Sequence, residues 1–544
     1  MIGGSTGRIR ALSLLLMHLV EATLLLLLLT TIAVPWARRI GLPTEIFLVL
    51  GSLGLSLVPG LPPLVLNPAV VFTLFLPPIL FAAAFFTSWR DLKRYRRAIV
   101  LLAVGLVLFT TALVAVAARA LGLGMSWPVA FLLGAIVSPP DASAAAAIIK
   151  KLGVPRRMLT IIQGESLVND ATALVAYKVA ISAIVTGSFS LGDASMKFLT
   201  LAAGGAGVGL IVAMAGISVV QRLNNTTAET TLLLITSFAT YLCAEHLGLS
   251  GVISTVAGGL YFGCKFPRLT SAQSRLESAA FWKTVLFMIN GSVFTLIGLQ
   301  MPEVMTGLQG YSRLQLAIYG SAVALVVMAA RFVWIFPATY LPRKVFPSIA
   351  RNEPAPRRSV VTALSWVGMR GIVSLGAALS IPMTLPSGAD FPFRHLIVFL
   401  TYIVILATLL IPSTTLPWLM RWLGIKDSGE SRREESAARL AIYQAVLREL
   451  GLLRRSSGFS QALLDDTALL FERRVQALED DRQPSVSRRF DEERNMRELT
   501  QRVVQSERKE LERLREQAAI ADAVFFQLNR ELDIEETLLH TEGI

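Results

Sequence analysis

The sequence predicts an all-helical, polytopic membrane protein with thirteen transmembrane helices and a helical cytosolic tail. The 544 residues are 53% hydrophobic and only 16% charged, whereas soluble domains carry about 25% charge. Of the 38 acidic residues, 13 precede residue 425 and 25 follow it. Apolar stretches of about 20 residues, the length that crosses a bilayer, recur throughout the first part. We therefore expect a transmembrane domain over residues 1–424 and a separate tail over 425–544.

The thirteen predicted spans alternate with loops of different charge. Clusters of Lys and Arg follow the odd-numbered spans and are nearly absent after the even ones. Because positive loops stay on the cytoplasmic side, the N-terminus is expected outside and the C-terminus inside a cell membrane. The first apolar run lacks a cleavage site, so we interpret it as a span. The spans lie near 12–36, 43–60, 68–88, 98–121, 126–150, 158–185, 194–220, 229–246, 249–264, 278–300, 314–342, 358–384 and 394–424.

The net charge of +13 does not indicate a nucleic-acid partner. The basic residues of the first part lie in short loops, where they set topology and meet anionic lipid. Cys243 and Cys264 lie in apolar stretches, and no metal-binding spacing is present. We therefore expect the lipid bilayer as a partner and no resident cofactor.

The fifth span is interrupted by Ser138-Pro139-Pro140-Asp141. Two prolines remove two backbone donors and clash with the preceding turn, so the helix should break near the middle of the membrane. Irregular backbone at that depth is tolerated only inside protein or beside a wet cavity. Asp141 favours a functional break over a simple proline kink.

The sixth span carries Glu165, Ser166, Asn169 and Asp170. Pairs four residues apart share one face of a helix, so these four side chains form one polar face. Acids inside a membrane are costly and usually functional. Asp170 lies about 18 Å from the helix start at about 1.5 Å per residue, close to the midplane. A carboxylate there can hold either a proton or a metal cation, while Glu165 is equally compatible with a structural ion pair.

The twelfth span contains Gly368-Met369-Arg370-Gly371, a buried cation between helix-weakening glycines. An inverted repeat of spans 1–6 and 8–13 would match this span to the fifth. Paired broken helices in matching positions indicate the binding site of a transporter. Arg331 in the eleventh span is a second buried cation, at least as compatible with a structural role.

Three functions fit an intramembrane carboxylate. A carrier is favoured because one buried acid per chain suits alternating occupancy by ion and proton. A passive cation channel would need a selectivity-filter repeat, which the sequence lacks. An intramembrane aspartyl protease using Asp141 and Asp170 would need Tyr-Asp and Gly-x-Gly-Asp patterns, which do not surround them. We therefore do not expect an enzyme.

The tail, with apolar residues three and four apart, predicts amphipathic helices with a regulatory or dimer-stabilising role.

Several segments over about 45–424 resemble the monovalent cation/proton antiporter family of the NhaP and eukaryotic NHE type. The most specific are Gly164-Glu165-Ser166-Leu167-Val168-Asn169-Asp170 and Arg370-Gly371-Ile372-Val373-Ser374-Leu375, in order and spacing. Leu76-Pro77-Pro78-Ile79-Leu80-Phe81 and Gly134–Asp141 match further family motifs.

The resemblance implies a homodimer that exchanges Na⁺, or K⁺ or Li⁺, for H⁺ by an elevator-like movement. Asp170 would carry ion or proton, with Ser166, Asn169 and the Pro140 carbonyl beside it. Glu165 and Arg370 would form a stabilising ion pair, and Asp141 would lie at the crossing of the broken helices. An Asn-Asp pair suggests electroneutral exchange. Ala82 and Ala83 stand where many members have a Glu, which puts the ion preference in question.

Overall fold

The computed structural model describes most residues from 24 to 480 and a few beyond. Two compact units are present, residues 1–428 and 429–544. The residues outside the description are 1–23, 25, 38, 41, 59–70, 142–155, 188–190, 306, 354, 426–429, 457–459 and most of 481–544.

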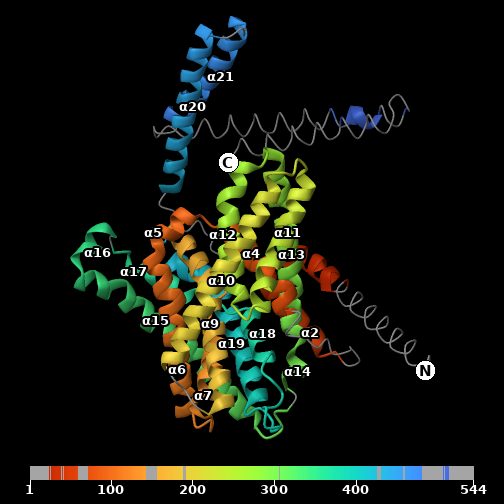
Figure 1. Cartoon of the computed structure of the whole chain (residues 1–544), viewed down its shortest axis with the longest axis vertical. Helices are drawn as coiled ribbons and strands as arrows, with labels where there is room; N and C mark the ends of the chain where they lie inside the picture. Colours follow the sequence, from red (N-terminus) through yellow and green to blue (C-terminus); the bar gives the residue numbers. More distant parts are fainter. Residues whose placement is uncertain are drawn as a thin grey trace. The chain divides into compact units, whose positions relative to one another are not determined.

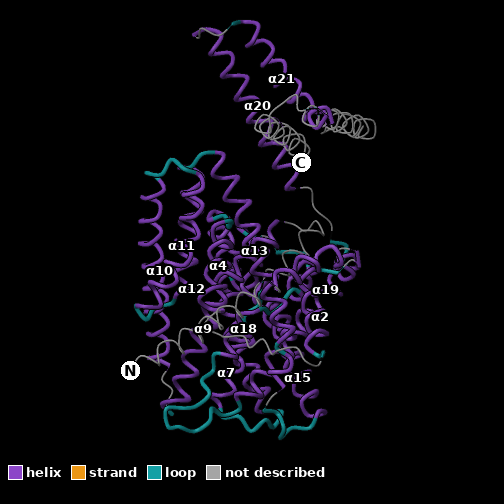
Figure 2. The backbone as a smooth tube through the Cα atoms, turned by 90° about the vertical axis from the view of Figure 1, so that its right-hand side faces the viewer, coloured by secondary structure: helices purple, strands orange, loops and turns teal. Residues whose placement is uncertain are grey.

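The first unit consists of helices joined by loops at their two ends (Figures 1 and 2). Its described residues contain no strand, only one isolated β-bridge between Thr384 and Asp390. The helices are α2 (Thr44–Ser56), η1 (Val71–Phe75), α4 (Leu76–Phe85), α5 (Trp89–Val100), η2 (Leu101–Leu106), α6 (Val107–Ala120), α7 (Trp127–Val137), α9 (Arg156–Thr186), α10 (Leu191–Val220), α11 (Thr226–His246), α12 (Gly251–Leu269), α13 (Ala272–Leu299), α14 (Met301–Met305), α15 (Arg313–Val345), α16 (Pro347–Asn352), α17 (Arg358–Trp366), α18 (Ile372–Leu379) and α19 (Arg394–Trp422).

Local sequence explains where many of these helices begin. Ser88, Asn225, Ser250 and Ser271 each accept a hydrogen bond from a backbone N–H in the first turn of the following helix. Ser312 forms a reciprocal capping box with Gln315. Such caps satisfy donors that the first turn would otherwise leave without a partner.

Each of the thirteen predicted spans overlaps a helix among the described residues. Six helices are long and apolar enough to cross a membrane by length and composition: 89–120, 157–186, 195–220, 272–305, 313–345 and 394–422. Shorter apolar helices lie at Leu26–Ala37, Thr44–Ser56, Phe72–Phe85 and Trp127–Val137. The all-helical prediction is confirmed for the described residues, while the count of thirteen crossings and the inverted repeat stay predictions.

A π-helical segment interrupts the long helix from Trp89 to Ala120. Trp334 of α15 donates from its indole Nε1 to the Leu101 carbonyl at 2.9 Å. Gly105 lies so close to the Trp334 ring that an added Cβ would meet the ring at 2.5 Å. The indole therefore satisfies a backbone group in the irregular turn, which is a recognised way to stabilise a π segment.

Glycines bring α10 and α12 into close contact. A Cβ added to Gly205 or Gly209 would collide with the backbone of Ser250 or Ser254. The small-residue face of α10 therefore packs within the chain, as such faces do in membrane helices.

The second unit contains α20 (Glu430–Ser456) and α21 (Gln461–Asp480), which pack together. Tyr443 and Phe471 form an edge-to-face pair with ring centroids 5.7 Å apart. Arg474 lies over both rings, which adds a cation–π contact among half-buried side chains.

Candidate ion-binding site

One helix of the first unit ends, and another is interrupted, at the predicted positions. α7 ends at Val137 and is followed by non-helical residues up to Asp141, while residues 142–155 lie outside the description. The twelfth predicted span forms α17 and α18, separated by non-helical residues 367–371. The prolines and glycines quoted above lie at these interruptions, which agrees with their physical effect on helices.

The two interruptions contact each other. The backbone N–H of Asp141 donates to the Met369 carbonyl at 2.7 Å. Gly371 lies against the Asp141 side chain, where an added Cβ would collide with the carboxylate. Glycine is required here because the backbone of one interruption approaches the side chain of the other. Asp141 therefore lies at the crossing, beside the N-terminal end of α18.

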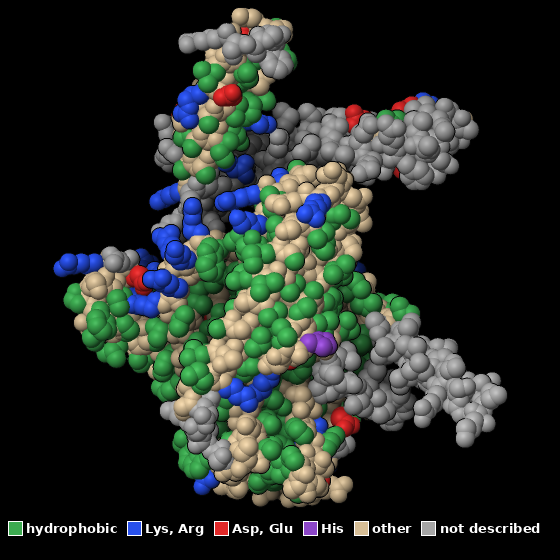
Figure 3. Space-filling model, in the orientation of Figure 1, with side chains coloured by type: hydrophobic (Ala, Val, Ile, Leu, Met, Phe, Trp, Pro, Cys, Tyr) green, Lys and Arg blue, Asp and Glu red, His purple; other side chains and the backbone are tan. Residues whose placement is uncertain are grey.

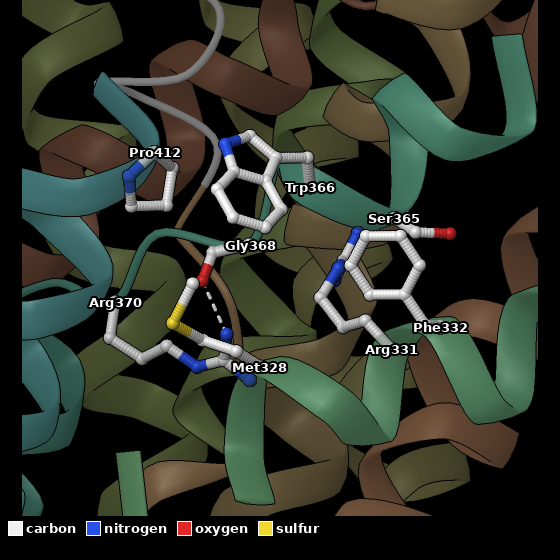
Figure 4. A pocket seen from close by; sticks show the side chains of 8 residues that line it. All are labelled: Met328, Arg331, Phe332, Ser365, Trp366, Gly368, Arg370 and Pro412. Carbon is white, nitrogen blue, oxygen red and sulfur yellow. Dashed lines mark hydrogen bonds between the residues drawn. The ribbon is translucent and has the colours of Figure 1, made fainter. Parts of the chain in front are cut away.

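Arg370 binds the backbone of both interruptions. Its Nε donates to the Val137 carbonyl at 3.1 Å, its Nη2 to the Ser138 carbonyl at 3.3 Å and its Nη1 to the Gly368 carbonyl. Figure 4 shows Arg370 turned toward Gly368 beside a small pocket that Arg331 also lines. The C-terminal end of a helix carries partial negative charge, so the guanidinium stabilises the end of α7.

The predicted ion-binding residues of α9 lie beside this crossing. The Asn169 Nδ2 donates to the Pro140 carbonyl at 2.6 Å, so two of the predicted ligands are in direct contact. Asn169 is fully buried and Asp170 is 8% exposed. Asp170 lies within electrostatic range of Asp141. Ser166 is half-buried one turn before Asp170. The structure therefore brings the predicted site residues of α7, α9 and the α17–α18 interruption together.

The expected ion pair between Glu165 and Arg370 is wrong. Glu165 is paired with Arg331 of α15, through Nη1–Oε1 at 2.6 Å and Nη2–Oε2 at 3.2 Å. Both side chains are at most 2% exposed. Arg331 also donates to the Leu364 carbonyl at 3.2 Å. The physical reason is that the Arg370 guanidinium is used by backbone carbonyls, so the carboxylate takes the other buried arginine. The sequence identified Arg331 as a second buried cation, in the preceding span, but did not indicate which of the two arginines faces Glu165.

The positions that depart from the family pattern lie in α4. Ala82 is fully buried in an aromatic cluster with Phe81, Phe262 and Trp282, whereas Ala83 is exposed.

Pro140, in the segment after α7, keeps its carbonyl for hydrogen bonding, and a carbonyl has two acceptor lone pairs. The Pro140 oxygen can therefore accept from Asn169 and still face a cation.

An all-helical membrane unit in which two interrupted helices meet beside buried carboxylates is the architecture of a secondary transporter. The chain belongs to the sodium/hydrogen exchanger family, because the family model for the transmembrane sodium/hydrogen exchanger matches residues 24–422. The chain is an integral membrane protein of a transporter family, not of an enzyme family.

Relatives and solved structures agree with this assignment. The chain is 35% identical over 509 residues, 92% of each chain, to an uncharacterized Na⁺/H⁺ exchanger of Mycobacterium tuberculosis. It is 37% identical over 371 residues, 65% of this chain and 54% of the relative, to a sodium, potassium, lithium and rubidium/H⁺ antiporter of Bacillus pumilus. The sodium proton antiporter MjNhaP1 from Methanocaldococcus jannaschii shares the fold with a TM-score of 0.60 at 20% identity, over 75% of this chain and 98% of that chain.

Proposed function

We propose that this chain exchanges Na⁺ for H⁺, with Asp170 holding the cation and the proton in turn. The observation that carries the proposal is the burial of Asp170 beside the two interrupted helices, where the neighbouring acid Glu165 is already neutralised by Arg331. No described residue forms an ion pair with Asp170. A buried carboxylate without a fixed counter-charge requires a mobile cation or a proton.

The surrounding oxygens suit an alkali cation. Ser166 and Asn169 precede Asp170 on α9 by four residues and by one, and the Asn169 amide contacts the Pro140 carbonyl. The Asn169 Oδ1 is buried and accepts no hydrogen bond from the described residues, so it is available as an oxygen ligand. Asp141 and Arg370 support this site by holding the crossing together, and the Glu165–Arg331 pair supports α9.

The charge of the pair at 169 and 170 favours electroneutral exchange. Asn169 is neutral and its amide is bonded to a backbone carbonyl, so the pair contributes one carboxylate charge. One carboxylate that binds either Na⁺ or H⁺ changes occupant without changing the number of charges bound. We propose one-for-one exchange on this basis.

We infer K⁺ and Li⁺ as further substrates from the relative in Bacillus pumilus, whose name includes both ions. The alanines at 82 and 83 remove an acid from the region of the site and are consistent with a broad cation preference.

We further propose an elevator-type movement in a homodimer, with the N-terminus outside and the C-terminus in the cytoplasm. The packing of the first unit supports two helix groups. One contains α4 and α10 to α13, and the other contains α6, α7, α9, α15 and α17 to α19. The most extensive packing within the groups, α10 and α4 on α12 and α7 on α6 and α9, is much larger than the packing of α9 on α10 or α12. A boundary of this kind suits sliding of one group against the other.

The deciding experiment measures exchange in everted vesicles with Asp170→Asn. We expect loss of Na⁺-dependent proton movement with normal expression, because the amide cannot alternate between proton and cation. Asp390→Asn is the matched control, since Asp390 is an exposed acid in the loop before α19. In the unmodified protein, the apparent affinity for Na⁺ should fall by up to about tenfold per unit decrease of pH where the two ions compete, because a protonated ligand cannot bind metal.

Robust exchange by Asp170→Asn would refute the proposed role of Asp170. Cation flux without a counter-flow of protons would favour the channel over the carrier. Comparing Na⁺, Li⁺ and K⁺ across pH 6–9 in the same vesicles tests the proposed ion range.

A further inference from the structure

Three arginines and one glutamate meet where α5, α9 and α15 come together at one end. Glu353 follows α16, and its Oε2 lies 3.3 Å from the Nη2 of Arg97 and 3.3 Å from the Nη2 of Arg343. Arg343 lies within electrostatic range of both Arg97 and Arg157. The cluster therefore contains three cations around one described acid, an excess of two positive charges.

The donors of this cluster are unevenly satisfied. Arg343 donates from Nε to the Glu353 carbonyl at 3.0 Å and from Nη1 to the Thr339 carbonyl. In contrast, the Nε and Nη1 of Arg97 are buried and have no hydrogen-bond partner among the residues that the structure describes. Arg157 lies over the ring of Tyr95, 5.5 Å from its centroid. Buried donors on a charged group are costly unless they are paired, so the cluster favours binding of an additional anion.

The surroundings of the cluster combine positive charge with exposed apolar surface. Figure 3 shows Lys and Arg side chains gathered around α5 and α16, next to hydrophobic side chains. The described basic residues that are exposed on α5, and from the end of α15 to the start of α17, are Arg90, Lys93, Arg94, Arg96, Lys344, Arg351, Arg357 and Arg358. Leu341, Val345 and Phe346, at the end of α15, are each more than half exposed. A free phosphate would need only the arginines, whereas a phospholipid uses both the cations and the apolar surface.

We propose that Arg97, Arg157 and Arg343 bind the phosphate of an anionic phospholipid whose acyl chains contact the exposed apolar end of α15. The bound lipid would tie together the ends of α5, α9 and α15. α9 and α15 are the two helices that the Glu165–Arg331 pair joins further along their length. The proposal does not depend on ion exchange, because it concerns a different group of residues and its test measures lipid binding and stability.

The test uses the full-length chain in nanodiscs of phosphatidylcholine alone or mixed with phosphatidylglycerol. Binding of fluorescent phosphatidylglycerol and the temperature of unfolding are measured in parallel. We expect phosphatidylglycerol to raise the unfolding temperature of the unmodified protein. Arg97→Gln and Arg157→Gln should each bind this lipid about fivefold more weakly, because a basic residue near the membrane surface contributes about that factor.

Three variants make the test specific to this cluster. Arg313→Gln removes one exposed charge at the start of α15, at the opposite end of this helix from Arg343, and it should retain the lipid effect. Arg157→Gln leaves both contacts of Glu353 intact, so it remains informative even if Arg97→Gln fails to fold. Glu353→Gln removes the competing acid and should tighten lipid binding.

Two results would overturn the proposal. One is an equal effect of phosphatidylglycerol on the unmodified protein, Arg97→Gln and Arg157→Gln, or no effect on any of them. The second is full stabilisation by inorganic phosphate in pure phosphatidylcholine nanodiscs, which would identify a soluble anion as the ligand.

Discussion

Glu165 and Arg331 form an ion pair that is almost completely removed from solvent, with two parallel N–H to oxygen contacts. Removing one partner of a buried pair leaves an uncompensated charge, which is far more costly than the net gain from the pair. Loss of one partner is therefore expected to destabilise the first unit, which is not expected for an exposed pair such as Arg454 with Asp465.

We expect Arg331→Met to lower the free energy of unfolding by about 3–5 kcal/mol, because Glu165 remains buried without its partner. The double variant Arg331→Met with Glu165→Met should recover much of this loss. Thermal unfolding of the single and double variants gives the coupling energy between the two positions. A coupling between Glu165 and Arg370 as large as that between Glu165 and Arg331 would contradict the pairing described above.

At this scale the sequence predicted which polar residues are buried in the membrane helices but not how they pair. Asp170, Asn169 and Asp141 are conspicuous because polar side chains are costly within apolar helices. The choice between Arg331 and Arg370 depends on which helix faces Glu165 and on which guanidinium the backbone carbonyls use. Neither is encoded in spacing along one helix, so the partner of Glu165 could be found only from tertiary structure.

At the scale of secondary-structure elements, the segment after α7 and the segment between α17 and α18 are held together by a close contact. The backbone of one segment lies against a side chain of the other. Gly371 leaves room for the Asp141 carboxylate, and the Asp141 N–H is bonded to the Met369 carbonyl. Interiors are packed too densely to absorb an added methyl group at such a point without a shift of the backbone.

Gly371→Ala is expected to disturb the crossing, with a loss of stability of about 1–3 kcal/mol and a marked loss of exchange. The comparison is Gly207→Ala in α10, where an added Cβ meets nothing within 4 Å. That change should be neutral or stabilise by up to about 1 kcal/mol, because alanine favours helix over glycine. Unfolding and vesicle exchange are measured for both variants, and equal behaviour of the two would count against a tight crossing.

The breaks in the helices were predictable and the π segments were not. Pro139, Pro140 and the glycines beside Arg370 weaken a helix by themselves, so their effect is visible in the sequence. The irregular turn after Val100 follows from the approach of Trp334, a residue more than two hundred positions away. The packing of Gly209 against Ser254 likewise depends on which helices become neighbours.

At the scale of the whole molecule, all of the candidate site residues lie in the first unit. The family model ends at residue 422, shortly before the second unit begins at residue 429. The helices α20 and α21 of the second unit pack on each other, so the first unit contains the complete set of residues proposed for exchange.

A chain shortened to residues 1–428 is therefore expected to fold and to retain Na⁺-dependent proton exchange. Vesicle assays with the full and shortened chains test this, and the oligomeric state of each in detergent tests the dimer-stabilising role of the tail. Loss of exchange in a shortened chain that still unfolds cooperatively would assign the tail an essential part in transport.

The guanidinium of Arg370 is bonded to carbonyls from two distant parts of the chain, Val137 and Ser138 on one side and Gly368 on the other. These bonds hold the end of α7 and the residues between α17 and α18 against each other. In the proposed elevator-type movement, we therefore expect these two segments to be displaced together. The proposed coordination geometry would then travel unchanged and set the selectivity, and the energetic barrier would lie in sliding along the surrounding helices.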